Sequence, residues 1–195
     1  MAPLSKEQFE AQRQASKMKI IVVALELFSK KGFINTSIND IAKTANISKG
    51  LMYNYFESKD VLLEECLKMV LEGVVGGIQA ATQIKNPEER LEFLIRTSFD
   101  MLKENPHIWK MFVSLSLQLD KESASYRILN EYWSQLFKNA VSIFKEMGYE
   151  DYEERAFRYG AMMDGLAMQY ILLGEENILF DKTLQGAINI YCYNK

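Results

Sequence analysis

The stretch INTSINDIAKTANISKGLMYNYFESK, residues 34–59, holds two short helical patterns separated by a tight turn. The first opens at Ser37, whose hydroxyl can accept the amide proton of Asp40. Asn46 tolerates the left-handed conformation that a sharp helix end needs, and Ser48 can cap the second helix. The apolar residues of the first pattern recur at helical spacing, at Ile38, Ile41, Ala42 and Ala45. Two short helices joined by about three residues predict a helix-turn-helix.

Helical patterns flank this pair on both sides. A helix is expected from about Lys17 to Lys31, with Gly32 as its C-terminal stop. Another is expected to begin at Ser58. Met52 and Phe56 are four residues apart, so both can bury toward the preceding helices. The stretch is therefore predicted to form a three-helix unit.

The rest of the second short helix has no evident place in a core. Gly50 lets a backbone come close, and the hydroxyls of Tyr53 and Tyr55 can donate to phosphate oxygens. In a helix-turn-helix the second helix enters the major groove. Leu51 is apolar on that side and can contact the methyl group of a thymine. The alternative is a three-helix packing unit that binds nothing.

The charge is unevenly distributed along the 195 residues, whose formal net charge is −3. Residues 1–60 hold nine Lys and Arg against six Asp and Glu, whereas residues 61–195 hold fourteen against twenty. A basic N-terminal module on an acidic body suggests nucleic acid at one end only. Ordinary charge fluctuation is the alternative.

The segment ALELFSKKGFINTSINDIAKTANISKGLMYNYFESKDVLL, residues 24–63, resembles the N-terminal domain of TetR-family transcription regulators. The resemblance covers residues 17 to about 70. It lies in Leu-Phe of the first helix, Gly-Phe after it, Thr-Ser before the second, and the Ser-Lys-Gly…Tyr…Tyr-Phe…Ser-Lys run. It implies an all-helical homodimeric repressor that binds double-stranded DNA and whose C-terminal domain binds a small effector.

The resemblance also implies roles for single residues. It assigns contacts with the sugar-phosphate backbone to Thr36, Ser48, Lys49, Tyr53, Tyr55 and Lys59. It places Gly50, Leu51 and Asn54 near base edges, and Ser37 is added to the DNA-binding set. The chain departs from the family at Leu51, where a small or hydroxylated residue is usual.

The whole chain is expected to be all-α, with a DNA-binding domain at residues 14–75 and a larger helical domain at residues 76–195. Aromatic and Met residues are dense in the second domain, and helical domains bind apolar ligands between helices. The alternative for each such residue is a place in the core. Candidate effector-binding residues are Trp109, Phe112, Trp133, Phe137, Met163 and Tyr170.

Small and apolar residues on the last two helices suggest a dimer-forming bundle. The alternative is that these helices bury against their own chain. Asp164 interrupts an otherwise apolar helix, where a capping or interface role is favoured over a ligand contact. Candidate interface residues are Gly160, Asp164, Gly165, Ala167, Leu184, Ala187, Ile188 and Tyr191.

Other classes of protein find little support in the sequence. No apolar run approaches the roughly 20 residues that cross a bilayer, and the start lacks a signal core, so a cytoplasmic protein without membrane contact is expected. Cys66 and Cys192 are isolated and are expected to be reduced structural thiols, and His107 is the lone histidine. No metal, cofactor or enzymatic activity is expected. A helical adaptor that binds protein, and a small helical enzyme, remain the alternatives.

Overall fold

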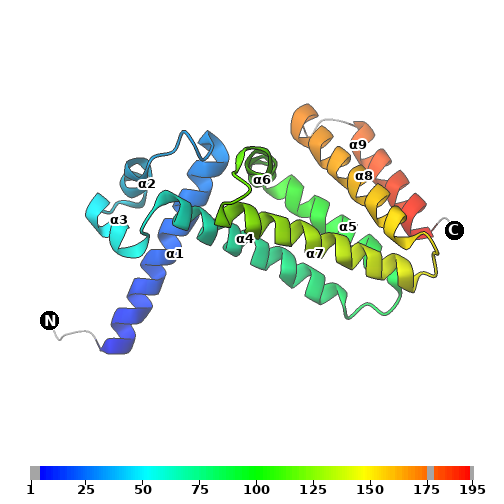
Figure 1. Ribbon diagram of the computed structural model, residues 1–195, viewed down its shortest axis with the longest axis horizontal. Helices are drawn as coiled ribbons and strands as arrows, with labels where there is room; N and C mark the ends of the chain where they lie inside the picture. Colours follow the sequence, from blue (N-terminus) through cyan, green and yellow to red (C-terminus); the bar gives the residue numbers. More distant parts are fainter. Residues whose placement is uncertain (1–4, 175–177, 194–195) are drawn as a thin grey trace. The chain divides into compact units, whose positions relative to one another are not determined.

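The computed structural model describes residues 5–174 and 178–193, and every regular element in these ranges is a helix (Figure 1). The all-α expectation is confirmed. The elements are α1 (Lys6–Lys31), α2 (Ile38–Ala45), α3 (Lys49–Tyr55), α4 (Lys59–Ala81), α5 (Pro87–Glu104), α6 (Pro106–Gln118), α7 (Ala124–Glu146), α8 (Tyr152–Leu173), α9 (Ile178–Ile188) and a π-helical turn (Asn189–Tyr193).

The chain divides into two compact units. The first unit comprises the residues up to Val70 together with Lys110–Ile128, and the second comprises Leu71–Trp109 and the residues from Leu129 onward. The sequence predicted a single boundary after residue 75. That boundary falls inside α4, which runs on as one helix from Lys59 to Ala81, so no turn residue marks the change of unit.

The helix α1 begins eleven residues earlier than its apolar pattern predicted. Ser5 and Gln8 form a capping box, in which the Ser5 hydroxyl accepts from the Gln8 amide and the Gln8 side chain accepts from the Ser5 amide. Before Ile20 no described side chain of α1 is buried. Apolar periodicity therefore could not mark this start, which depends on local capping instead.

The turns of the first unit form as their residues predicted. Gly32 ends α1 with φ 84°, and Asn46 ends α2 in the left-handed region at φ 57°, ψ 49°. The Ser37 hydroxyl accepts from the Asp40 amide at 3.1 Å. The Ser48 hydroxyl accepts from the Leu51 amide, also at 3.1 Å. These caps fix where the short helices α2 and α3 begin and how the chain turns between them.

The core of the first unit holds the helix-turn-helix in place. Helix α1 contacts α2, and α2 contacts α3. Met52 and Phe56 are buried to 2% exposure or less, as expected. The buried set also includes Ile20, Ala24, Phe28, Ile41, Ala45, Leu62, Leu63 and Cys66.

The second unit has a separate core, and this core corrects part of the expected dimer interface. Helices α8 and α9 lie side by side (Figure 1), and α9 turns its apolar stripe inward against its own chain. Phe144 lies against Tyr191 with ring centroids 6.1 Å apart. Periodicity in the sequence indicated that this apolar stripe is buried. It could not tell whether the stripe packs on the same chain or on a partner. Buried in this core, and so unavailable to a partner, are Leu184, Ala187, Ile188 and Tyr191.

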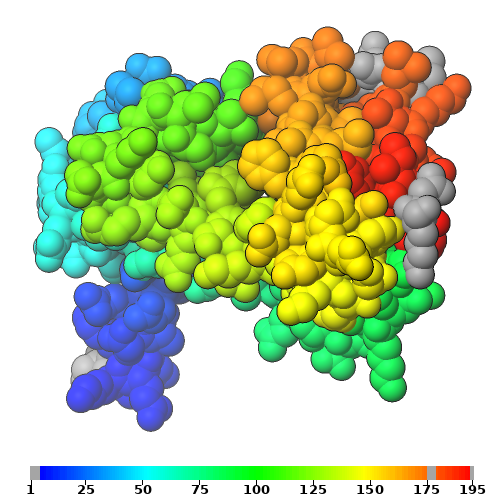
Figure 2. Space-filling view, turned by 45° about the vertical axis from the view of Figure 1, so that its right-hand side comes forward, coloured from blue at the N-terminus to red at the C-terminus, as the bar shows by residue number. Residues whose placement is uncertain are grey.

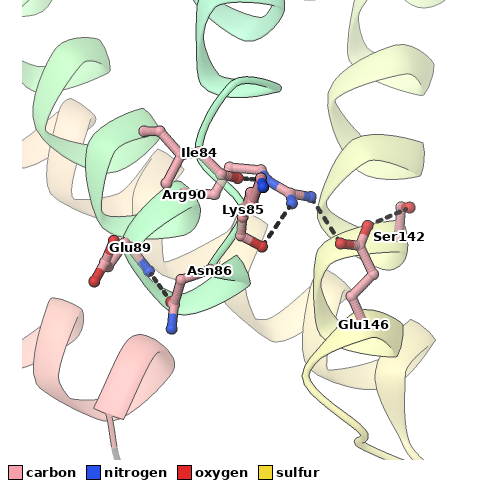
Figure 3. Close-up of polar contacts among 7 residues, drawn as sticks. All are labelled: Ile84, Lys85, Asn86, Glu89, Arg90, Ser142 and Glu146. Atoms are coloured by element: carbon pink, nitrogen blue, oxygen red, sulfur yellow. Dashed lines mark hydrogen bonds and ion pairs between the residues drawn. The ribbon is translucent and has the colours of Figure 1, made fainter.

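One arginine joins the turn between α4 and α5 to the end of α7 (Figure 3). Arg90 Nε donates to the Ile84 carbonyl at 2.9 Å, and a terminal nitrogen donates to Glu146 Oε2 at 2.8 Å. A third bond, of 3.3 Å, reaches the Lys85 carbonyl. The planar guanidinium matches these divergent acceptors because its donors are held in a fixed fork.

Arg90→Lys is expected to lower the free energy of unfolding by about 1–3 kcal/mol, because one ammonium cannot replace the fork and cannot satisfy the part-buried Ile84 carbonyl together with Glu146. Denaturant unfolding measures this. The matched control is Arg13→Lys on the exposed part of α1, which should change stability by no more than about 0.5 kcal/mol. Equal stability of the two variants would contradict the role given to Arg90.

Candidate nucleic-acid interface and ligand pocket

Helix α3 has one buried side and one side that the first unit does not use. At about 100° per residue, Met52 and Phe56 point together into the core. Gly50, Leu51 and Asn54 then lie on the opposite side, where all three are exposed. Tyr53 and Tyr55 flank this side, Tyr53 at 48% exposure and Tyr55 half-buried. An apolar Leu51 with 39% of its surface exposed is not explained by packing within the chain.

Gly50 is not required by the fold itself. It has no positive φ, and a Cβ built there would meet only the Ser48 hydroxyl oxygen, at 4.0 Å, an ordinary contact. An alanine would therefore fit, and would favour the helix by roughly 0.5–1 kcal/mol. A glycine at this place is consistent with a need for something outside the chain to come close.

The serine and threonine residues of the expected DNA-binding set differ in whether their hydroxyl protons are free for a phosphate. Thr36 is only 1% exposed, and its hydroxyl donates to the Gly32 carbonyl at 2.9 Å, so it belongs to the turn after α1 and presents no surface to DNA. The Ser37 hydroxyl donates to the Asp40 carboxylate at 2.5 Å. The exposed Ser48 hydroxyl only accepts, from the Leu51 amide, so its proton is free for a phosphate.

Lys59 has a structural role that sequence analysis missed. Its ammonium donates to the carbonyls of Phe33, at 2.9 Å, and Thr36, at 3.0 Å. It also lies 4.3 Å from the centroid of the Phe33 ring. The first residue of α4 thus clasps the turn between α1 and α2. We refer to these contacts as the Lys59 clasp, and they leave the ammonium one donor for any phosphate.

Lys49 is the better-placed cation for a phosphate. It is exposed at the first turn of α3, where backbone amides also point outward, and it makes no ion pair with any described residue. Two other cations of the unit are already paired: Lys17 contacts Glu65 at 2.7 Å, and Lys30 contacts Glu26 at 2.7 Å. Lys17, together with Lys68, holds the pKa of the Glu65 carboxyl below its usual value.

The second unit contains an apolar pocket of about 480 Å³ between its own helices. That volume lies within the range of about 300–1,000 Å³ found for small-molecule sites. Of the six expected effector-binding residues, Trp109, Trp133, Phe137 and Met163 line it.

The other two expected residues lie elsewhere. Tyr170 is in the core, with its ring 4.9 Å from that of Phe180. Phe112 is buried in the stretch of α6 that belongs to the first unit. Helical spacing selected apolar faces correctly, but it could not separate residues that fill a core from residues that border a cavity.

Several lining residues were not singled out for this role by sequence reasoning. Tyr132, Phe157 and Tyr159 line the pocket, and so do Gly160, Asp164 and Ala167, which were expected at a dimer interface. A signal was present on α8, where small residues recur beside aromatic ones. It was interpreted as close helix packing, whereas small side chains also leave room for a ligand.

The outer surface of α8 carries an apolar stripe that no described part of the chain covers. Figure 2 shows this helix, in yellow to orange, open along its length. Phe157 is 70% exposed and Leu172 is 73% exposed. The stripe, named here the α8 stripe, consists of Phe157, Ala161, Gly165, Met168 and Leu172, and it borders the pocket at Phe157 and Ala161.

Both cysteines of the chain are buried. Burial raises the pKa of the Cys66 thiol to about 12, with a contribution from Glu65. Burial likewise raises the pKa of the Cys192 thiol to about 12. Both thiols are protonated at neutral pH and are free cysteines. Over the described ranges, no group of three or more His, Cys, Asp or Glu could hold a metal ion, and no helix is long and apolar enough to cross a membrane.

Residues 20–66 match the family model described as bacterial regulatory proteins of the tetR family. Across 175 residues the chain is 26% identical to the HTH-type transcriptional regulator BetI of Escherichia coli K12, covering 87% of this chain and 88% of that protein.

Solved structures share the fold over nearly the full length. A TetR-family transcriptional regulator of Streptomyces coelicolor superposes with a TM-score of 0.80 at 15% identity, covering 91% of this chain and 94% of that chain. A Clostridium perfringens protein, described as a candidate regulator of fatty acid metabolism, gives 0.73 at 21% identity, with 89% and 96% covered. At these identities the structures establish the fold only.

Gly50→Ala is expected to keep or slightly raise the unfolding temperature and to weaken DNA binding about tenfold or more, a loss of about 1.4 kcal/mol. The reason is that the added methyl stands on the outward side of α3. Gly73→Ala is the matched control, since it is also a helical glycine and a Cβ there meets nothing within 4 Å. Unchanged DNA affinity of Gly50→Ala would show that α3 does not bind DNA this closely.

Lys49→Ala is expected to affect DNA affinity, whereas Lys59→Ala is expected to affect stability. Loss of Lys49 should make the slope of log affinity for DNA against log salt concentration shallower, by the amount that one phosphate contact per protomer contributes. It should not change the free energy of unfolding. Loss of the Lys59 clasp should instead lower the free energy of unfolding by about 1–3 kcal/mol, because two part-buried carbonyls lose their donor. If Lys59→Ala is as stable as wild type and its DNA affinity depends less on salt, Lys59 binds a phosphate and the structural role given to it here is wrong.

Proposed function

The chain belongs to the TetR family of transcriptional regulators, and we propose that it is a repressor that binds an operator as a homodimer and is released by a small-molecule effector. The observation that carries the proposal is the outward side of α3. Its exposed glycine, leucine and asparagine, with tyrosines beside them, are not needed by the fold. They form a surface that a major groove can receive.

The contacts divide between positioning and reading. Ser48, Lys49 and Tyr53 have free donors and bind phosphates, which fixes the register of α3 on the duplex. Leu51 and Asn54 face the bases. Leu51 packs on a thymine methyl, which gives each half-site a preference for thymine over cytosine at that position.

The dimer forms through the α8 stripe. A contiguous apolar surface on a helix is an expected place for a partner. A second copy of the chain is the simplest partner to cover this surface, because the α8 stripes of two copies can pack on each other around a two-fold axis. Gly165 and Ala161 let the two helices approach closely. Two copies of α3 spaced about 34–36 Å apart then enter successive major grooves.

The effector occupies the pocket of the second unit. The pocket is lined mainly by apolar and aromatic side chains with few polar groups, which suits a largely apolar small molecule. The dimer exists in two forms, of which one has the α3 spacing that fits DNA. The effector shifts the equilibrium between them only by the difference in its affinity for the two forms. Such a protein works in the cytoplasm and has no enzymatic activity of its own.

A protein-binding adaptor is the second candidate, because the exposed tyrosine and leucine of α3 can also bind protein. Ionic strength separates the two, since affinity for DNA falls steeply with salt and apolar protein packing does not.

Leu172→Glu and Gly165→Leu are expected to shift the protein toward monomer in sedimentation. The first places a charge in the proposed contact, and the second overpacks it at a cost of about 1–3 kcal/mol per site. Both positions are exposed in the single chain, so the fold should persist. Affinity for a DNA fragment selected by the wild-type protein should fall in parallel.

Leu117→Glu is the matched control, because Leu117 is 83% exposed but lies on α6, outside the stripe. It should remain as dimeric as the wild type. If both α8 variants stay fully dimeric, the interface lies on another surface.

A further inference from the structure

The pocket of the second unit contains one ionisable carboxylate and no cation. Among the described residues that line it, Asp164 is the only Asp, Glu, Lys, Arg or His. The remaining polar groups are neutral, namely Thr97, Ser98 and Asn139 with the two tyrosine hydroxyls. A ligand in the pocket therefore meets a negative charge that no lining residue neutralises.

Asp164 also lacks a partner among the described residues, unlike two acidic residues at the start of α8, the N-cap Asp151 and Glu154 of the first turn. Glu154 pairs with Arg158, and Asp151 pairs with Arg158 at 2.7 Å. Asp164 makes no hydrogen bond or ion pair with any residue in the described ranges. Its side chain lies at the rim and is still exposed, but its apolar surroundings raise the pKa of its carboxyl by desolvation. An uncompensated carboxylate in an apolar rim is stabilised by any cation that can reach it.

Aromatic rings surround the same space. Tyr132 and Tyr159 lie near enough to Asp164 that its charge adds to burial in raising the pKa of both phenols. Trp109, Trp133 and Phe137 complete the aromatic lining. The faces of such rings attract cations, most strongly when water is excluded. The carboxylate and the rings thus favour the same kind of group.

We infer that the effector is a hydrophobic organic cation carrying one positive charge, such as an alkyl- or arylammonium. Its charged end lies at Asp164 between the rings, and its apolar body fills the space between α5 and α7. This inference rests on the proposed effector role of the pocket and names the ligand class. A fatty acid is disfavoured, because its carboxylate would meet Asp164 without a cation between them.

The test uses the two tryptophans of the chain, Trp109 and Trp133, both of which line the pocket, so that intrinsic fluorescence reports on its occupancy. The probes are decyltrimethylammonium, 1-decanol and decanoate, each titrated below its micellar or solubility limit. Wild type should bind the ammonium about tenfold more tightly than the alcohol, because a contact between the cation and the carboxylate is expected to lower the dissociation constant about tenfold. Decanoate should bind most weakly.

Three variants isolate the charge. Asp164→Asn keeps the size of the side chain and should bind the ammonium and the alcohol equally. Asp164→Glu should keep the preference. Glu153→Gln is the control, since it removes a charge from α8 outside the pocket lining and should behave as wild type.

The inference is overturned if wild type binds the alcohol or decanoate as tightly as the ammonium, if the preference survives in Asp164→Asn, or if no probe changes the fluorescence. It is also overturned if sedimentation shows Asp164→Asn to be monomeric, since Asp164 would then be an interface residue. DNA release is assayed separately. If only the neutral alcohol releases the protein from DNA, the proposed regulator function stands and the inference of a cationic effector is wrong.

Discussion

The burial of Met52 and Phe56 is the constraint on which the exposed side of α3, the surface that we propose binds DNA, depends. Helix α3 has seven residues, too few to be stable alone in water. It persists because these two side chains are buried in the core of the first unit and because Ser48 caps its first turn. With both anchors on one side, the other side is free of any role in folding. That freedom leaves Gly50, Leu51 and Asn54 available for the DNA recognition that we propose.

The Lys59 clasp extends this constraint along the chain. It joins the start of α4 to the turn between α1 and α2, through the Phe33 and Thr36 carbonyls. The same helix α4 continues without a break to Ile78, which lines the pocket of the second unit. In the function proposed above, a ligand bound at this end of α4 acts on the same helix whose first residue holds the turn between α1 and α2. We propose that pocket occupancy affects DNA binding along this helix.

The sequence predicted the first unit well because its structure is determined locally. Capping serines, the left-handed Asn46 and the spacing of Met52 and Phe56 each act over a few residues, and each formed as predicted. The structural role of Lys59 was missed because its partners, 23 and 26 residues away, appear only once the chain is folded. In the second unit, periodicity found the apolar faces of α8 and α9. It could not tell Ile188, which packs on its own chain, from Leu172, which remains exposed.

Selection of genomic DNA fragments by the full-length protein tests the central claim most directly, when it is compared with selection by a Gly50→Ala, Asn54→Ala variant under the same salt conditions. The account predicts that wild type enriches an inverted repeat whose half-sites are one helical turn, or a multiple of it, apart. The variant, whose fold is intact but whose α3 surface is changed, should lose that enrichment. Recovery of the same fragments by both proteins, or of no common sequence by wild type, would contradict it.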